Sequence, residues 1–475
     1  MPATAAPTDQ LAYLLEEQRS YAPALAKTTA GERREKIDRV IGYLDNETNK
    51  QRLLDALRQD LHKHPVETLL SEIGVVYSNA KYLRRHLKRW MEPRRVSTPL
   101  SLIGTRSYVY YEPKGSVLIL APWNYPFNLA VIPVLYAIAA GCTVVLKPSE
   151  YSPATSSYMQ EMFGTLFAEN EVKVVLGEAD TAAALTALPF DHIYFTGSPA
   201  TGKKVMAAAA PNLASVTLEL GGKSPCVVGE DVNIEKSARS LTWGKFFNAG
   251  QTCIAPDYAL VHEKIVTEYV GRLGEAIRHA YGEDPQQSDS LARIVNEKQF
   301  DHLTGLLEDA LDKGAKVAHG GHHDRASRYF EPTVLTGVTG VTGEMRVMQE
   351  EIFGPLLPVL DYANLNEALS VINGLPKPLA FYIQTDERSI IKRLLAETSA
   401  GGTLVNEFLL GTANPALPFG GVGNSGIGRS YGHHGWLEFT NERAVMERRL
   451  FDLSMAYPPY TDKVRQLVER VYKWA

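Results

Sequence analysis

From residue 115 onward, short apolar runs alternate with helix-like segments. Ser116–Leu120 has the length and apolar character of a buried strand, Ile132–Ala140 is helix-like, and Thr143–Leu146 is a second strand. The same alternation continues with strand-like runs at 172–176, 192–195, 258–261, 356–360 and 379–383, and with helix-like segments at 153–168, 180–187, 234–247, 264–280 and 297–313. This pattern predicts parallel, doubly wound sheets that bind ligands at the carboxyl ends of their strands. It restarts after residue 230, which indicates two α/β units.

Two regions stand apart from this alternation. Residues 8–92 are expected to be helical, because aliphatic residues recur at helical spacing with charged residues between them. The basic run Arg84–Arg89 could bind an anionic partner, but the apolar and aromatic residues interleaved with it favour a solvated helix face. Ser107–Pro113 is rich in aromatic and β-branched residues, which predicts a strand that forms an arm and pairs elsewhere.

Composition excludes several classes of protein. The chain has 475 residues, a formal net charge of −5 and three cysteines. A nucleic-acid partner is not expected, because the chain is not basic. The cysteines lack the spacing of a metal site or a disulfide framework, so no metal is expected. Residues 1–10 do not resemble a signal peptide, and no apolar run reaches the length of a membrane span. We therefore expect a cytoplasmic enzyme without a membrane anchor.

Cys253 is the candidate nucleophile. The residues at 250–252 are small or polar, whereas a core cysteine is usually flanked by aliphatic residues. Because an ordinary thiol is mostly protonated at neutral pH, a catalytic cysteine needs a base or a positive charge nearby. Glu219 lies just ahead of two glycines, which can leave a carboxylate uncovered at a strand end, and it is the candidate base. The alternative is that Cys253 only packs, since free cysteine is among the most buried residue types.

A glycine-containing loop at Gly197–Lys203 lies between a predicted strand and a predicted helix, where free backbone N–H groups favour a phosphate. Its spacing matches a P-loop, but Lys204 occupies the position of the magnesium-binding serine or threonine, which argues against an NTPase. The dinucleotide fingerprint G-x-G-x-x-G is also absent. A dinucleotide could still rest on this helix N-terminus in another pose.

Three further motifs carry candidate site residues. Lys147 and Glu150 follow a strand end, where they could hold ribose hydroxyls, although Lys-Pro-Ser-Glu is also simply a good helix start. Asn124 offers a neutral donor for an oxyanion, unless it is an ordinary turn residue. Glu351 and Phe353 alternate along the chain and could point the same way.

Together these motifs resemble those of the aldehyde dehydrogenase superfamily. The motifs are Trp-Asn-Tyr-Pro, Lys-Pro-Ser-Glu, Phe-Thr-Gly-Ser, Glu-Leu-Gly-Gly-Lys, Gly-Gln-Thr-Cys, Glu-Ile-Phe-Gly-Pro and Pro-Phe-Gly-Gly, in this order over residues 60–460. The segment 417–426 and the tail 457–460 are most similar to the class 3 branch, which includes fatty, aromatic and coniferyl aldehyde dehydrogenases. The resemblance implies an α/β fold with a Rossmann-type cofactor domain, an α/β catalytic domain and a small oligomerisation arm.

The resemblance also implies the chemistry and the organisation of the chain. Cys253 would be the nucleophile, Glu219 the base that activates water, and Asn124 the oxyanion donor together with the backbone N–H of Cys253. The implied contacts to NAD, or to NADP as an alternative, come from Trp123, Lys147, Glu150, Thr196, Gly197, Ser198, Gly202, Leu220, Glu351 and Phe353. The implied segments are a cofactor domain at 1–97 and 116–220, a catalytic domain at 221–410, bridging and oligomerisation elements at 98–115 and 411–450, and a tail at 451–475.

The expected reaction is NAD(P)-dependent oxidation of an apolar aliphatic or aromatic aldehyde to the carboxylic acid, in a homodimer. Candidates for the substrate walls are Tyr125, Trp243, Phe247 and Phe408. Two other functions stay open from the sequence. One is a cysteine-dependent acyl transferase or thioesterase without a redox cofactor, and the other is a catalytically silent binding protein on the same fold.

Overall fold

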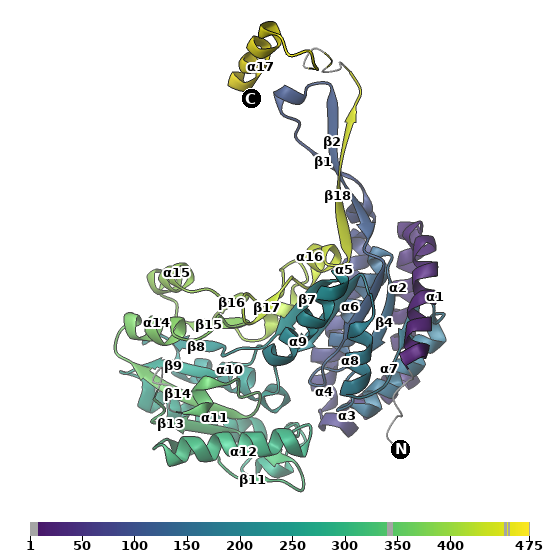
Figure 1. The fold of residues 1–475 in the computed structure, drawn as a ribbon. Helices are drawn as coiled ribbons and strands as arrows, with labels where there is room; N and C mark the ends of the chain where they lie inside the picture. The colour runs from purple at the N-terminus through teal and green to yellow at the C-terminus, as the bar shows by residue number, and fades with distance from the viewer. Residues whose placement is uncertain (1–7, 340–344, 451–453, 455–456, 475) are drawn as a thin grey trace.

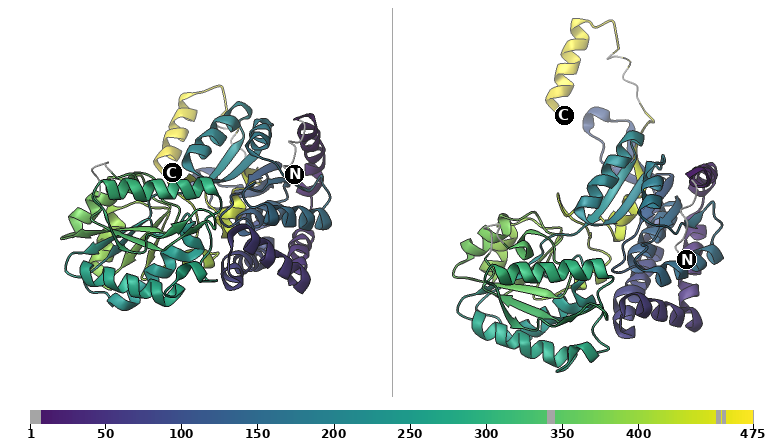
Figure 2. Two further views of the ribbon diagram at one scale, coloured as in Figure 1. Left: turned by 90° about the horizontal axis from the view of Figure 1, so that it is seen from below. Right: turned by 60° about the horizontal axis from the view of Figure 1, so that its bottom comes forward.

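The computed structural model describes residues 8–339, 345–450, 454 and 457–474, and the remaining residues of the predicted cofactor domain, catalytic domain and tail lie outside the described part. Two α/β lobes lie side by side, and a slender β arm projects from one of them (Figure 1). The two further views show the same two lobes and the separate arm (Figure 2). The predicted fold class is confirmed.

Helices fill the N-terminal region, as its periodicity predicts. Thr29 begins the second helix with a capping box, in which its hydroxyl accepts from the Glu32 N–H at 3.3 Å and the Glu32 carboxylate accepts from the Thr29 N–H at 2.7 Å. The elements are α1 (Thr8–Ala26), α2 (Ala30–Asp45), α3 (Glu47–Leu61), α4 (Pro65–Thr68), the π-helical turn η1 (Leu69–Ile73) and α5 (Gly74–Met91). The basic run Arg84–Arg89 lies on α5 with its charged side chains exposed, which agrees with a solvated face.

A six-stranded sheet forms the first lobe, in the order β17-β7-β6-β3-β4-β5. Its strands are parallel except β17, which runs antiparallel to β7 and pairs Gly426 with Glu219. Alternate side chains of β3 enter two cores: Val117 packs among α2, α5 and α6, and Leu118 packs among α1, α8 and α9. The strands are β3 (Ser116–Leu120), β4 (Thr143–Lys147), β5 (Val172–Val174), β6 (His192–Gly197), β7 (Ser215–Leu220) and β17 (Gly426–Ile427), and the helices are α6 (Asn128–Ala140), α7 (Pro153–Leu166), α8 (Ala179–Ala187) and α9 (Pro199–Ala209).

A seven-stranded sheet forms the second lobe, in the order β10-β13-β14-β9-β8-β15-β16. Only β10 is antiparallel. The strands are β8 (Pro225–Val228), β9 (Tyr258–His262), β10 (Lys316–His319), β13 (Thr333–Thr336), β14 (Leu356–Tyr362), β15 (Ala380–Gln384) and β16 (Gly402–Val405). The helices are α10 (Ile234–Phe246), α11 (Val266–Tyr281), α12 (Glu297–Asp312), α13 (Arg346–Gln349), α14 (Leu365–Asn373) and α15 (Arg388–Glu397), with a small hairpin of β11 (His323–Asp324) and β12 (Tyr329–Phe330).

The arm consists of β1 (Arg94–Val96), β2 (Thr105–Pro113) and β18 (Thr440–Arg448). β2 pairs with β18 along its full length, from Pro113 opposite Thr440 to Thr105 opposite Arg448. The predicted arm strand is therefore confirmed, and its partner is the C-terminal strand. In the predicted tail, the helix α17 (Asp462–Trp474) stands beyond the arm (Figure 1).

After the second lobe the chain returns to the first, where it contributes β17 and the helix α16 (Gly432–Leu437), which packs against α5 and α6. The division of the chain into domains at the expected residues stays a prediction. None of the helices in the described part of the chain has the length and apolar character needed to cross a membrane.

Candidate active site

Cys253 lies in a tight turn that follows α10 and the 3₁₀ segment η4 (Phe247–Gly250). Asn248 and Ala249 have left-handed backbone angles, with φ of 53° and 51°. Gly250 also has positive φ, and a Cβ there would lie 2.3 Å from the Gly354 carbonyl oxygen, so only glycine fits. This turn leaves Cys253 partly exposed, whereas the other two cysteines of the chain are buried.

Asn124 follows β3 and is held against the turn that carries Cys253. Its Nδ2 donates to the Gln251 carbonyl oxygen at 3.0 Å, which leaves a second amide hydrogen for another acceptor. Asn248 Nδ2 donates to the carbonyl oxygens of Asn124 and Gln251, at 2.9 and 3.1 Å. The structure thus brings the predicted oxyanion donor and the predicted nucleophile to one place.

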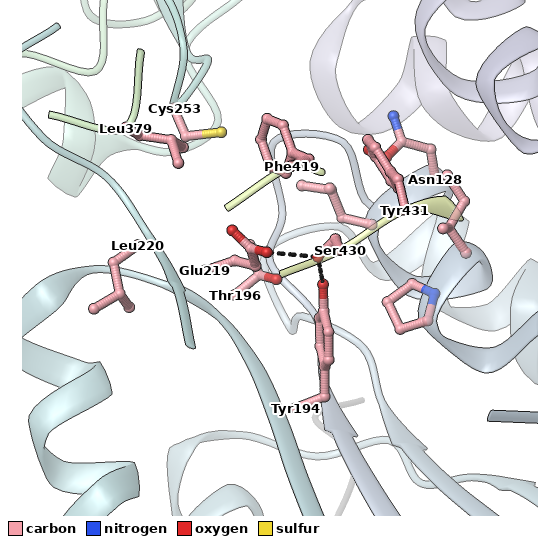
Figure 3. A pocket seen from close by; sticks show the side chains of 13 residues that line it. Asn128, Tyr194, Thr196, Glu219, Leu220, Cys253, Leu379, Phe419, Ser430 and Tyr431 are labelled. Carbon is pink, nitrogen blue, oxygen red and sulfur yellow. Dashed lines mark hydrogen bonds between the residues drawn. The ribbon is translucent and has the colours of Figure 1, made fainter. Parts of the chain in front are cut away.

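Glu219 lies near the end of β7, and its side chain faces the same cavity as Cys253 (Figure 3). Its Oε1 accepts from Ser430 Oγ at 2.5 Å, and Ser430 also contacts the Tyr194 hydroxyl. Its Oε2 has no hydrogen-bond partner. Burial raises the pKa of Glu219 to about 8, against the opposing effects of the Ser430 hydrogen bond and the Arg429 charge. A carboxyl with such a pKa is suited to proton transfer near neutral pH.

The environment of Cys253 favours the protonated thiol over the thiolate. Burial and the carboxylates of Glu351 and Glu219 raise the pKa of Cys253 to about 12. The thiol must therefore lose its proton during the reaction, either to a neighbouring carboxylate or under the influence of a positive charge.

A cleft of about 550 Å³ is lined by Cys253 and by residues at the carboxyl ends of β6 and β7. The first residues of α9 line it. In this first turn Pro199 has no N–H, the Thr201 N–H donates to Ser198 Oγ at 3.3 Å and the Gly202 N–H donates to the Ser198 carbonyl oxygen at 2.9 Å, which leaves the Ala200 N–H for an anion. Seven of the ten predicted cofactor contacts line this cleft: Trp123, Thr196, Gly197, Ser198, Leu220, Glu351 and Phe353.

The far wall of the cleft fits a nucleotide cofactor. A Cβ at Gly221 would lie 2.0 Å from Glu351 Oε2, so this backbone can approach the carboxylate only because it bears no side chain. Glu351 offers acceptors for ribose hydroxyls. The Phe353 ring, on a residue with φ of 51°, lies edge-on to Trp123 at 5.3 Å between centroids, which gives a flat group an apolar wall.

The other three predicted cofactor contacts lie outside this set of lining residues. Lys147 Nζ donates to Glu150 Oε2 at 3.1 Å at the end of β4. Gly202 lies in α9, where a Cβ would stand 2.7 Å from Leu220 Cδ2, so it permits the helix to pack closely on β7. The nucleotide contacts predicted for all ten residues stay predictions.

A second cavity, of about 220 Å³ and mainly apolar, also reaches Cys253, and we call it the tunnel. Tyr125, Trp243 and Phe247 line it, as do Leu129 and Ile254. Phe408, the fourth expected wall residue, is instead buried and packs on Tyr382 at 4.8 Å between ring centroids. Cys253 thus lines both the cleft and the tunnel.

Comparison with known proteins decides the family. The model of the aldehyde dehydrogenase family matches residues 3–445. The chain belongs to the aldehyde dehydrogenase family. This aldehyde dehydrogenase is 43% identical over 416 residues to the 4,4'-diaponeurosporen-aldehyde dehydrogenase of Staphylococcus aureus, covering 87% of this chain and 89% of the relative. It is 40% identical over 427 residues to a probable coniferyl aldehyde dehydrogenase of Pseudomonas aeruginosa, covering 89% and 88%.

A solved structure supports the same conclusion. The substrate-bound state of Staphylococcus aureus AldH superimposes with a TM-score of 0.92 at 38% identity, covering 98% of this chain and all of that one. This aldehyde dehydrogenase is therefore an oxidoreductase, and enzymes of its family use NAD(P). The predicted family and activity are confirmed.

Two residues beside the site of this aldehyde dehydrogenase could not be identified from the sequence. Ser430 bonds Glu219 but carries no local signal of its own. Lys245, on α10, is fully buried, its Nζ has no hydrogen-bond partner among the residues that the structure describes, and burial lowers the pKa of Lys245 to about 8. It follows a glycine and precedes two phenylalanines, so the local pattern indicates only an ordinary helix end.

Proposed function

We propose that Cys253 is the nucleophile, Asn124 with the Cys253 backbone N–H the oxyanion donor, and Glu219 the base that activates water. One observation carries the proposal: a carboxylate with a free oxygen and a raised pKa shares a cavity with the partly exposed thiol. Asn124 supports it, because its amide is fixed beside the same turn.

The residues act in two stages. The Cys253 thiol loses its proton to solvent as its sulfur bonds to the aldehyde carbon, and the Asn124 amide stabilises the oxyanion that results. A bound oxidised nicotinamide would supply the hydride acceptor. Loss of hydride leaves a thioester on Cys253. Glu219 then takes a proton from water, the water oxygen bonds to the acyl carbon, and the carbon–sulfur bond breaks to release the acid.

We propose NAD as the preferred nucleotide. The Glu150 carboxylate would accept hydrogen bonds from ribose hydroxyls and repel a 2′-phosphate. Lys147 is paired with Glu150 at 3.1 Å, so its charge partly offsets this repulsion, and slower turnover with NADP is also expected. When reduced-nucleotide formation is measured with an aldehyde, turnover is expected to be faster with NAD than with NADP at equal concentration. Faster turnover with NADP would contradict this preference.

We propose an apolar aliphatic or aromatic aldehyde as the substrate, because the tunnel is mainly apolar and the two relatives are named for such aldehydes. The test is reduced-nucleotide formation with a panel of short aliphatic, long aliphatic and aromatic aldehydes. Leu129→Trp, which fills the tunnel, is expected to lower kcat/KM for long and aromatic aldehydes about tenfold or more and to leave short ones nearly unchanged. Leu213→Trp, at a residue that is 93% exposed, is the control. An equal loss for all aldehydes contradicts the tunnel assignment.

We propose that the arm joins two copies of the chain in a homodimer. Large apolar side chains are exposed on the arm, among them Leu100, Tyr110 and Met446. Light scattering is expected to give about twice the mass of the 52.4 kDa chain. A Met446→Glu variant is expected to shift this mass toward the monomer, and a monomeric wild type contradicts the assignment. The cytoplasmic location stays a prediction.

A further inference from the structure

Lys63 carries a buried charge directly behind the oxyanion donor. It lies in the short link between α3 and α4, and its side chain is completely buried. Its Nζ donates to Glu72 Oε1 at 2.7 Å and to the Asn124 carbonyl oxygen at 2.9 Å. Both Lys63 and Glu72 lie in the N-terminal helical region, which is far in sequence from the turn that carries Cys253.

Two of the three donors of the Lys63 ammonium make these hydrogen bonds. Glu72 Oε2 accepts from the Asn128 N–H at 2.8 Å, so both carboxylate oxygens are bonded. Burial raises the pKa of the Glu67 carboxyl, and the ammonium acts against this effect by lowering that pKa. Burying an ion pair of this kind usually adds little net stability compared with apolar side chains of the same volume, so the charges do not by themselves explain the contact with Asn124.

Lys63 contacts Asn124 directly, and it contacts Tyr125, which in turn bonds the residue that precedes Cys253. The Asn124 carbonyl oxygen has two donors, Lys63 Nζ and Asn248 Nδ2, each at 2.9 Å. The ammonium also lies 3.9 Å from the centre of the Tyr125 ring. The Tyr125 hydroxyl is 2.6 Å from Thr252 Oγ1, on the residue that precedes Cys253.

We propose that Lys63 is a positioning residue for aldehyde oxidation, and that it acts by fixing the backbone of Asn124. The inference rests on the oxyanion role proposed above for Asn124. An amide donor stabilises an oxyanion only when it is held at hydrogen-bond distance before the charge develops. The ammonium holds the Asn124 backbone at its carbonyl oxygen, while the Asn124 amide donates to the Gln251 carbonyl oxygen.

The test compares Lys63→Met with the unaltered enzyme in pre-steady-state measurements of reduced-nucleotide formation. The burst rate is expected to fall about 10- to 100-fold, because misplacing a catalytic group by about 1 Å has an effect of this size. NAD affinity and KM for the aldehyde are expected to change little. Lys63→Arg, which keeps the charge, is expected to recover part of the rate. If Lys63→Met does not fold, Glu72→Gln loosens the same ammonium and replaces it in the test.

A double-mutant cycle separates positioning from a general structural role. On an Asn124→Ala background, Lys63→Met is expected to lower the burst rate by less than about twofold more, because its effect passes through Asn124. The control is Lys36→Met, which removes an ammonium paired with Glu171 on the far side of α2 and is expected to leave the rate unchanged.

The outcomes are distinct. Equal losses from Lys63→Met in both backgrounds overturn this inference, as does a normal burst rate in Lys63→Met when Asn124→Ala is impaired. A normal burst rate in Asn124→Ala itself overturns the oxyanion role and therefore the proposed function of that residue.

Discussion

Replacing Cys253 with alanine is expected to abolish aldehyde oxidation and to leave nucleotide binding intact. The sulfur forms the bond on which both stages depend, and no second cysteine can substitute, since Cys142 and Cys226 are 1% and 0% exposed. Losing a covalent nucleophile lowers kcat by at least about 10⁴-fold. The nucleotide cleft is lined mainly by other residues, so its shape should persist.

The measurement has two parts. Stopped-flow absorbance of reduced nucleotide is expected to show neither burst nor steady-state turnover in Cys253→Ala, while titration with NAD gives an affinity close to that of the unaltered enzyme. Cys142→Ala and Cys226→Ala are the matched controls, and they should keep their rates even if they lower thermal stability. A residual burst in Cys253→Ala would remove this residue from the nucleophile role.

The sequence predicts those parts of the site that are encoded locally. Cys253 is recognisable because small and polar residues precede it, and Glu219 because two glycines follow closely. The strands that line up these motifs have strong apolar runs, such as β3, whose five residues are all buried. At these residues the local sequence pattern is enough to predict where the fold places them.

The sequence does not predict contacts made between distant segments. Ser430, which bonds Glu219, is 211 residues away from it in the chain, and Lys63 is 61 residues from Asn124. β17 has two residues, too few for an alternating pattern, yet it closes the sheet beside Glu219. Phe408 is a residue that the sequence placed wrongly. Its aromatic side chain suggests a tunnel wall, but the fold buries it against Tyr382. These features depend on the fold as a whole.

Replacing Glu219 with glutamine is expected to separate the two stages of the reaction. Glutamine keeps the size and the hydrogen bond to Ser430 but cannot take a proton from water. The first turnover should still form reduced nucleotide as a burst, whereas the steady-state rate should fall about 10²- to 10⁴-fold, the usual contribution of a general base. The acyl-enzyme should then accumulate, and mass spectrometry of quenched samples would detect the added acyl group on Cys253.

Glu351→Gln is the matched control for this experiment. Glu351 is a half-buried carboxyl in the same cleft, and desolvation raises its pKa to about 8 as well. Because it is assigned to the nucleotide, its replacement should raise the Kd of NAD and preserve the ratio of burst rate to steady-state rate. If Glu351→Gln accumulates the acyl-enzyme and Glu219→Gln does not, the base is Glu351.

The pH dependence gives an independent check on Glu219. A base acts only when it is ionised, and burial raises the pKa of this carboxyl to about 8, so the deacylation rate should increase as pH rises through about 8 and then level off. Ser430→Ala removes a hydrogen bond that favours the ionised form, so the midpoint of the profile should move to higher pH. Glu219→Gln should lose this rise altogether. A midpoint that stays fixed in Ser430→Ala would mean that the titrating group is not Glu219.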